Sequence, residues 1–509
     1  MQICTRCSKS RKQCSYEHES GTDLIFRNFA AKLSLQVEPP LDDRSNSILT
    51  AATHPAISHI GTALDNGFIN PALNKNVLLE DFLHGFCIKS KDHNLSRGYL
   101  DGLPRLLEHG NTNTNVSKAA NAAALGFAGM RYQRRDLLVE AEKAYASLLR
   151  SFRKTIVEIE DSTRIDTFMT TVLLGLYEIM TATDISPGAQ NIHLQGLSAI
   201  LTAAGPPFDL LGGIRVFSSA NALPTKSPAP SIISFATMLE PPVPGPVQNL
   251  DATMSKLQPV LSQSDELLSS SSHNIEALYA FFDQVSEAGQ ELDTWRSRQV
   301  NEWQPHTLLH SAPDRCCIGK LELRLGRIET YYDVYVASVW NTYRKCHILI
   351  LDLQWRCAKK LQGMLAGNSK TSTEEQVRMQ SKANELSQGL LSSVAYHLTN
   401  LSTLPDPTSA GTDDISRKLE ETGKPVGGLL LMHPMYVVAQ VSIIEDEMRR
   451  YARRTLGWIG KNMGIGEAAV LANEQSSIPF RYAAQGHVLV WAGMLIQSPF
   501  VCSGLRAGR

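Results

Sequence analysis

The sequence predicts an all-α protein, and two observations lead to that prediction. Apolar side chains recur at steps of three and four residues over 138–156, 169–180 and 332–353. This spacing puts them on one face of a helix, as in amphipathic helices that bury one side. Runs that alternate apolar and polar residues, the pattern of a half-buried strand, are scarce.

Proline-rich stretches divide the chain. The first helical region ends at Gly205-Pro206-Pro207, because proline removes a backbone donor and clashes with the preceding turn. Residues 217–275 hold two proline-rich segments and a serine run with few aromatic residues, a composition that cannot bury a core. We therefore expect a cysteine-containing head at 1–17, a linker with the first helices at 18–116, a helical core at 117–216, a Pro/Ser-rich linker at 217–275 and a second helical part at 276–509.

Length and composition narrow the class of protein. The 509 residues are enough for roughly three units at about 150 residues per domain. With 43% hydrophobic residues the chain can bury a sizeable core, and its net charge of −1 shows no overall basicity. Nine cysteines, an odd number, do not resemble a disulfide framework. We expect a soluble intracellular protein with no membrane contact, since the apolar runs are shorter than a bilayer span.

Most of the conspicuous side chains in the helical regions are predicted to pack in the core. Trp340 and Tyr343 are expected to be buried anchors, and His193 a core or capping histidine. Gly126 lies among small residues that let helices approach closely. We expect a helix to end before Pro434, because the residue that precedes a proline avoids helical backbone angles.

Three cysteines near the N-terminus have the spacing of metal ligands. Cys4, Cys7 and Cys14 form a C-x2-C-x6-C pattern. Thiolates three residues apart can reach one metal ion, and the third can close around it. A tetrahedral zinc site needs four ligands, so the set is one short; His18 is a permissive fourth ligand. The alternative is a basic head that binds no metal.

Basic residues surround these cysteines. Arg6, Lys9, Arg11 and Lys12 all precede the first acidic residue, Glu17. Nearby positive charge lowers a thiol pKa and so eases the deprotonation that metal binding requires. Once a metal ion fixes the loop, the same side chains lie close enough to contact DNA phosphates.

The segment CTRCSKSRKQCSYE, residues 4–17, resembles the second half of the fungal binuclear zinc-cluster transcription factors. In that family six cysteines hold two zinc ions in two C-x2-C-x6-type halves. The residues that fit the second half are Cys4, Cys7, Lys9, Ser10, Cys14 and Tyr16. The first half, which carries the lysine that approaches the base edges, has no counterpart, because Met1 lies only three residues before Cys4. Either a first half-cluster encoded upstream of Met1 or loss of that half-cluster from this protein would explain its absence from the sequence.

The helical body resembles the fungal-specific transcription factor regulatory region. Four segments, which begin at Ser117, Asp166, Val334 and Gly427, resemble its blocks in the expected order. The fold is thus expected to be a large helical regulatory domain behind a small, incomplete zinc-cluster head and a Pro/Ser-rich linker.

The resemblance implies a nuclear regulator of RNA polymerase II genes. It implies zinc bound by Cys4, Cys7 and Cys14, and contact of Arg6, Lys9, Arg11 and Lys12 with double-stranded promoter DNA. Members of the family often dimerise, act on the transcription machinery, and frequently control metabolic or secondary-metabolite gene sets.

Two other classes of protein are alternatives. Because the cluster is incomplete, the chain could be a helical co-regulator or interaction protein without DNA contact, which binds partners or a small effector through its body. An enzyme has little support: no G-x-x-x-x-G-K-[ST], H-E-x-x-H or G-x-S-x-G motif occurs. The Asp pairs at Asp42 and Asp413 lack the third acid of a magnesium cluster.

Overall fold

The computed structural model describes most of the helical body. The described residues are 71–92, 95–109, 113–157, 164–184, 274–309, 327–364, 373–404, 411–473 and 489–494, with isolated positions between 193 and 268 and between 317 and 322. The head at 1–17 and most of the 217–275 linker lie outside these residues.

The described residues form an all-α fold, as the sequence predicts. The α-helices are α3 (Pro71–Phe86), α4 (Leu103–His109), α5 (Asn115–Arg131), α6 (Arg135–Val157), α7 (Arg164–Thr181), α11 (Ile275–Ser297), α12 (Val334–Met364), α13 (Thr373–Ser392), α14 (Val394–Leu398), α15 (Thr412–Glu420), α16 (Pro425–Gln440), α17 (Asp446–Met463) and α18 (Gly466–Ala472). Two 3₁₀-helices are η5 (Asn301–Trp303) and η6 (Asn400–Thr403). Strand β1 (His306–Leu309) pairs with β4 (Ile328–Thr330), and β2 (Cys317–Ile318) pairs with β3 (Leu321–Glu322), both antiparallel.

Helix α5 is the centre of the first group of helices, where it packs against α3, α6 and α7. Its small residues permit close contact, as predicted. A Cβ atom added at Gly126 would lie 2.8 Å from Cγ2 of Thr181 and 3.0 Å from the Tyr177 ring, so any larger residue would force these side chains to move. Phe82, Phe86 and Phe127 form an aromatic cluster between α3 and α5.

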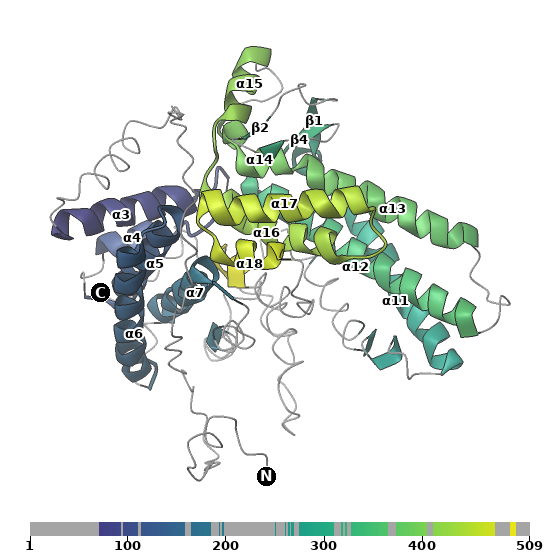
Figure 1. The fold of residues 1–509 in the computed structure, drawn as a ribbon, viewed down its shortest axis with the longest axis horizontal. Coiled ribbons are helices and arrows are strands. Elements are labelled where there is room, and N and C mark those ends of the chain that lie inside the picture. Colours follow the sequence, from purple (N-terminus) through teal and green to yellow (C-terminus); the bar gives the residue numbers. More distant parts are fainter. Residues whose placement is uncertain are drawn as a thin grey trace, which may run out of the picture. The chain divides into compact units, whose positions relative to one another are not determined.

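Helix α12 is the long central helix of the second group. Figure 1 shows it beside α11 and α13, and it also packs against α16. It is buried on nearly all sides from Val334 to Leu353, as expected for a helix enclosed by neighbours. Its first turn is capped by Asp333, which accepts a 2.9 Å hydrogen bond from the backbone N–H of Val336 and another from the Ser96 hydroxyl.

The expected helix end before Pro434 is wrong. Helix α16 continues through Pro434 to Gln440. A proline inside a helix leaves the carbonyl four residues earlier without its usual donor. Side chains on every side of α16 are buried from Pro425 to Ala439, so packing against α12, α14 and α17 outweighs the local preference.

The segment that leads from α11 to β1 is attached to α12 by tryptophans. The Trp340 indole N–H donates to the Trp303 carbonyl at 2.6 Å, and the Trp303 indole donates to the Leu95 carbonyl at 3.1 Å. Trp295 and Tyr343 stack beside them with ring centroids 5.1 Å apart. These contacts hold the β1–β4 pair next to α12 and confirm Trp340 and Tyr343 as buried anchors.

Two glycines of α17 give a matched test of this packing. A Cβ atom at Gly460 would lie 2.6 Å from the backbone nitrogen of Ala469 in α18, whereas at Gly457 the nearest atom is 3.8 Å away. Gly460→Ala should therefore lower the free energy of unfolding by about 1–3 kcal/mol through overpacking. Gly457→Ala should raise it by about 0.5–1 kcal/mol, because alanine favours a helix interior. Urea unfolding measures both; equal effects would contradict this packing.

Candidate functional site

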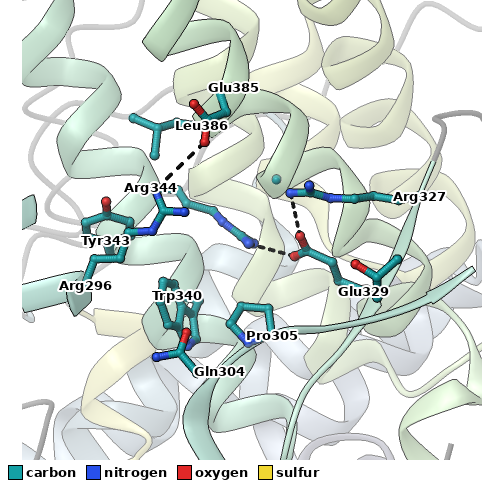
Figure 2. A pocket seen from close by; sticks show the side chains of 12 residues that line it. Arg296, Gln304, Pro305, Arg327, Glu329, Trp340, Tyr343, Arg344, Glu385 and Leu386 are labelled. Carbon is teal, nitrogen blue, oxygen red and sulfur yellow. Dashed lines mark hydrogen bonds and ion pairs between the residues drawn. The ribbon is translucent and has the colours of Figure 1, made fainter. Parts of the chain in front are cut away.

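A pocket lies where α11, α12 and α13 meet the β1–β4 pair. Its volume is about 210 Å³. Three arginines and two glutamates are among its lining residues, beside Trp340 and Tyr343. Figure 2 shows these side chains converging from different helices and from β4.

Glu329 of β4 is the centre of the charged network. Its Oε1 atom lies 2.8 Å from Arg327, and its Oε2 atom lies 2.7 Å from Arg344 (Figure 2). The Tyr331 hydroxyl also donates to Oε2 at 2.6 Å. Glu329 and Arg344 are only 4% and 7% exposed, so the buried charge of Arg344 depends on this carboxylate for compensation.

Arg344 is held by more than this carboxylate. Its Nη1 atom donates to the Tyr331 hydroxyl at 2.7 Å and to Oδ1 of Asn341 at 3.3 Å. Burial acts to lower the pKa of Arg344, but Tyr331 and Glu329 outweigh it and raise that pKa, so the guanidinium stays charged. Burial raises the pKa of Tyr331 well above its ordinary value, which keeps its hydroxyl available as a donor.

The opposite side of the pocket carries a looser ion pair. Arg296 of α11 and Glu385 of α13 lie 3.9 Å apart and are 51% and 67% exposed. Such a pair is worth little, because solvent screens both charges. Tyr343 lies between this pair and the core; burial raises its pKa to about 12, although the neighbouring Arg296 acts to lower it.

The hydrogen-bond network extends from the pocket into α14. The Asn341 amide nitrogen donates to Ser393 Oγ at 2.8 Å and lies 3.1 Å from Nε2 of His397. Burial and, to a smaller extent, the charge of Arg344 lower the pKa of His397 to about 3. His397 is therefore neutral at neutral pH, with Nε2 as the acceptor.

The chemistry of the pocket suits binding. Glu329 already accepts from three donors, which leaves it unsuited to act as a general base. The exposed guanidinium of Arg296 is a group that pairs with carboxylates and phosphates.

The predicted zinc and DNA-binding site lies outside the part of the chain that the structure describes. Cys4, Cys7 and Cys14, with Arg6, Lys9, Arg11 and Lys12, all lie outside the described residues. Within the part of the chain that is described, no group of three or more His, Cys, Asp or Glu side chains is arranged to hold a metal ion. None of the helices described has the length and apolar character needed to span a bilayer.

His193, expected to be a core or capping histidine, is buried. Its Nε2 atom lies 3.1 Å from Oε1 of Glu178 and 3.2 Å from the Tyr145 hydroxyl. Burial acts to raise the pKa of Glu178, but the charge and hydrogen bond of His193 and the hydrogen bond of Tyr145 lower it overall. The group has the contacts of a core polar cluster between α6 and α7.

The pocket around Arg296, Arg327 and Arg344, the arginine pocket, was not predicted from the sequence. One signal was present: Arg344 follows Trp340 by four residues, so a charged side chain falls on the predicted apolar face of α12. A charge in that position requires a buried partner. The partner, Glu329, lies before the helix on a short strand that the pattern does not predict.

Comparison with known proteins identifies the family. No protein-family model matches the chain, and no solved structure matches it. The chain is 30% identical over 432 residues to transcription factor dbaG of Emericella nidulans, an alignment that covers 84% of this chain and 98% of that protein. The chain therefore belongs to the same family of fungal transcription factors as dbaG.

His397 gives the site a predictable pH dependence. Because its folded-state pKa of about 3 lies below the unfolded value near 6.5, the unfolded chain binds more protons between these values. Stability should thus fall as pH drops below about 6.5, and His397 should contribute about 2 kcal/mol of that loss between pH 7 and pH 5.

The measurement is urea unfolding at both pH values. The variant His397→Gln should lose less stability between pH 7 and pH 5 than the wild type. Part of the loss should remain, because burial also lowers the pKa of His347, to about 4. The matched change at the exposed His306 should keep the wild-type loss. An identical loss in the His397→Gln variant would show that this histidine does not control acid stability.

Proposed function

We propose that this protein is a transcriptional regulator of RNA polymerase II genes that binds DNA through a zinc cluster. The observation that carries the proposal is the family relationship to a transcription factor over most of the chain. The resemblance of residues 4–17 to half of a binuclear zinc cluster adds the means of DNA contact. By the same reasoning the protein acts in the nucleus and requires no catalytic step.

The head would supply the metal ligands. Cys4, Cys7 and Cys14 offer thiolates, the donors that zinc prefers in closed structural sites. Their donor chemistry fits zinc, but three ligands fill only three of four tetrahedral positions. The proposal therefore includes a further ligand, either His18 or cysteines from a second half-cluster.

The basic side chains would supply the DNA contacts. Arg6, Lys9, Arg11 and Lys12 carry four positive charges within seven residues, in a chain whose net charge is −1. Contacts of this kind neutralise phosphates and position a protein on duplex DNA without reading sequence. Specificity for a promoter site would come from a dimer or from the second half-cluster.

The helical body would regulate the head. It would contact the transcription machinery and form a homodimer, and the genes controlled would be a metabolic or secondary-metabolite set. The family resemblance supports these assignments.

A co-regulator without DNA contact is the second candidate. The observation that favours it is the incomplete ligand set, because a cluster with three thiolates cannot close around zinc unaided. The genomic sequence upstream of Met1 separates the two candidates. An in-frame C-x2-C-x6-C half there supports the DNA-binding regulator, and its absence supports the co-regulator.

Substitution of single cysteines tests the DNA-binding proposal. Cys7→Ser should lower the zinc content per chain, measured by elemental mass spectrometry. It should also lower binding to DNA duplexes selected from a random pool, because zinc binding and DNA binding depend on the same cluster. The control is Cys87→Ser: burial raises the pKa of that thiol to about 12, so it stays protonated and does not act as a zinc ligand. Purified full-length protein without zinc that retains no duplex would contradict the proposal.

A further inference from the structure

We propose that helix α17 binds the phosphate backbone of double-stranded DNA through Arg450, Arg454 and Lys461, which together form the basic stripe. The inference deepens the proposed function, on which it rests, by naming a second DNA-contacting surface outside the zinc-cluster head. Its support comes from the exposure of these side chains, from the way the other arginines of α17 are bound, and from the polar character of this face.

The basic stripe lies on the solvent side of α17. Its three side chains are exposed and follow one another at steps of four and seven residues. Because an α-helix has 3.6 residues per turn, these steps place them on one face, over about 16 Å of helix. Glu447 begins the same face, which therefore carries three positive charges and one negative charge. The other side of α17 packs against α16 and α18, and Figure 1 shows α17 in front of α16.

The inner arginines of α17 are bound within the protein, but those of the basic stripe are not. Arg449 pairs with Asp446, and Arg453 donates to the Ala439 carbonyl at 2.9 Å. No ion pair or hydrogen bond joins the side chains of the basic stripe to any residue that the structure describes. Their charges therefore have no structural partner to satisfy and are available to an external anion.

The polar character of this face favours DNA over a protein partner. In the described part of the chain the exposed large apolar side chains are Val139, Val300 and Val377, and none of them is on α17. A protein partner gains most of its binding energy from a few large side chains in desolvated pockets, which this face does not offer. DNA needs no such anchor, because arginine and lysine release the counterions condensed on its phosphates.

Contacts from the basic stripe would add affinity without sequence specificity. Phosphate contacts position a protein on duplex DNA, whereas base contacts read the sequence. Because the net charge of the chain is −1, binding of DNA by the body requires such a local concentration of positive charge. Each phosphate contact adds about 0.9 to the slope of log affinity against log salt concentration, so the three side chains would add about 3.

The salt dependence of binding to a random-sequence duplex tests the basic stripe in the full-length protein. Fluorescence anisotropy of a labelled duplex measures affinity from about 50 to about 200 mM salt. The double variant Arg450→Gln/Arg454→Gln should lower the slope by about 2 and weaken binding about tenfold or more, because two phosphate contacts are lost. The double variant Arg450→Lys/Arg454→Lys should keep the slope, because it keeps both charges.

The matched control removes the same charge elsewhere. Arg150→Gln/Arg298→Gln changes two exposed arginines, one on α6 and one at the end of α11, and should leave the slope at the wild-type value. An unchanged slope in Arg450→Gln/Arg454→Gln, or an equal loss in the control, would overturn the inference. Polyglutamate should displace the duplex poorly; displacement at the same charge concentration as unlabelled DNA would show that the stripe binds acidic polypeptide instead.

The same measurements on the Cys7→Ser protein separate this inference from the zinc-cluster proposal. Cys7→Ser should lose the preference for selected duplexes but keep the salt-dependent binding to random sequence that depends on the basic stripe. Loss of all duplex binding in Cys7→Ser would overturn the inference and leave the zinc cluster standing. Unchanged zinc content and unchanged preference for selected duplexes, with a slope still lowered by Arg450→Gln/Arg454→Gln, would contradict the zinc cluster alone.

Discussion

The buried guanidinium of Arg344 is the constraint on which the arrangement of the second group of helices depends. Arg344 lies on the enclosed part of α12, where the carboxylate of Glu329 compensates its charge and Tyr331 and Asn341 accept its other hydrogen bonds. Leaving such a charge without a partner would be strongly destabilising. The chain before α12 must therefore bring β4 against the helix, and the Trp303–Trp340 contact keeps the preceding segment next to it.

This arrangement creates the pocket as a consequence. Because β4 is held over α12 by its charged pair, a space remains between the strand and the exposed Arg296 and Glu385 side chains of α11 and α13. The inner side of that space is a buried hydrogen-bond network that reaches His397, and the outer side is a weak surface pair.

The sequence predicted the helices better than it predicted the site, for a physical reason. Periodic apolar residues at 138–156, 169–180 and 332–353 correspond to α6, α7 and α12, because burial of one face is a local property of a helix. The continuation of α16 through Pro434 depends on packing against other helices, and the burial of Arg344 depends on Glu329 in a three-residue strand before α12. The zinc-cluster head stays a prediction, because it lies outside the described residues.

The most direct measurement is a double-mutant cycle on Arg344 and Glu329, read as the free energy of urea unfolding. The account predicts that Glu329→Leu loses about 3 kcal/mol or more, since it leaves the buried Arg344 without a carboxylate. Arg344→Met should lose less, because Arg327 still pairs with Glu329. The protein with both changes should lose less than the sum, by about 1.5 kcal/mol or more. Additive losses would show that the two groups act independently, and that the buried pair does not organise this part of the fold.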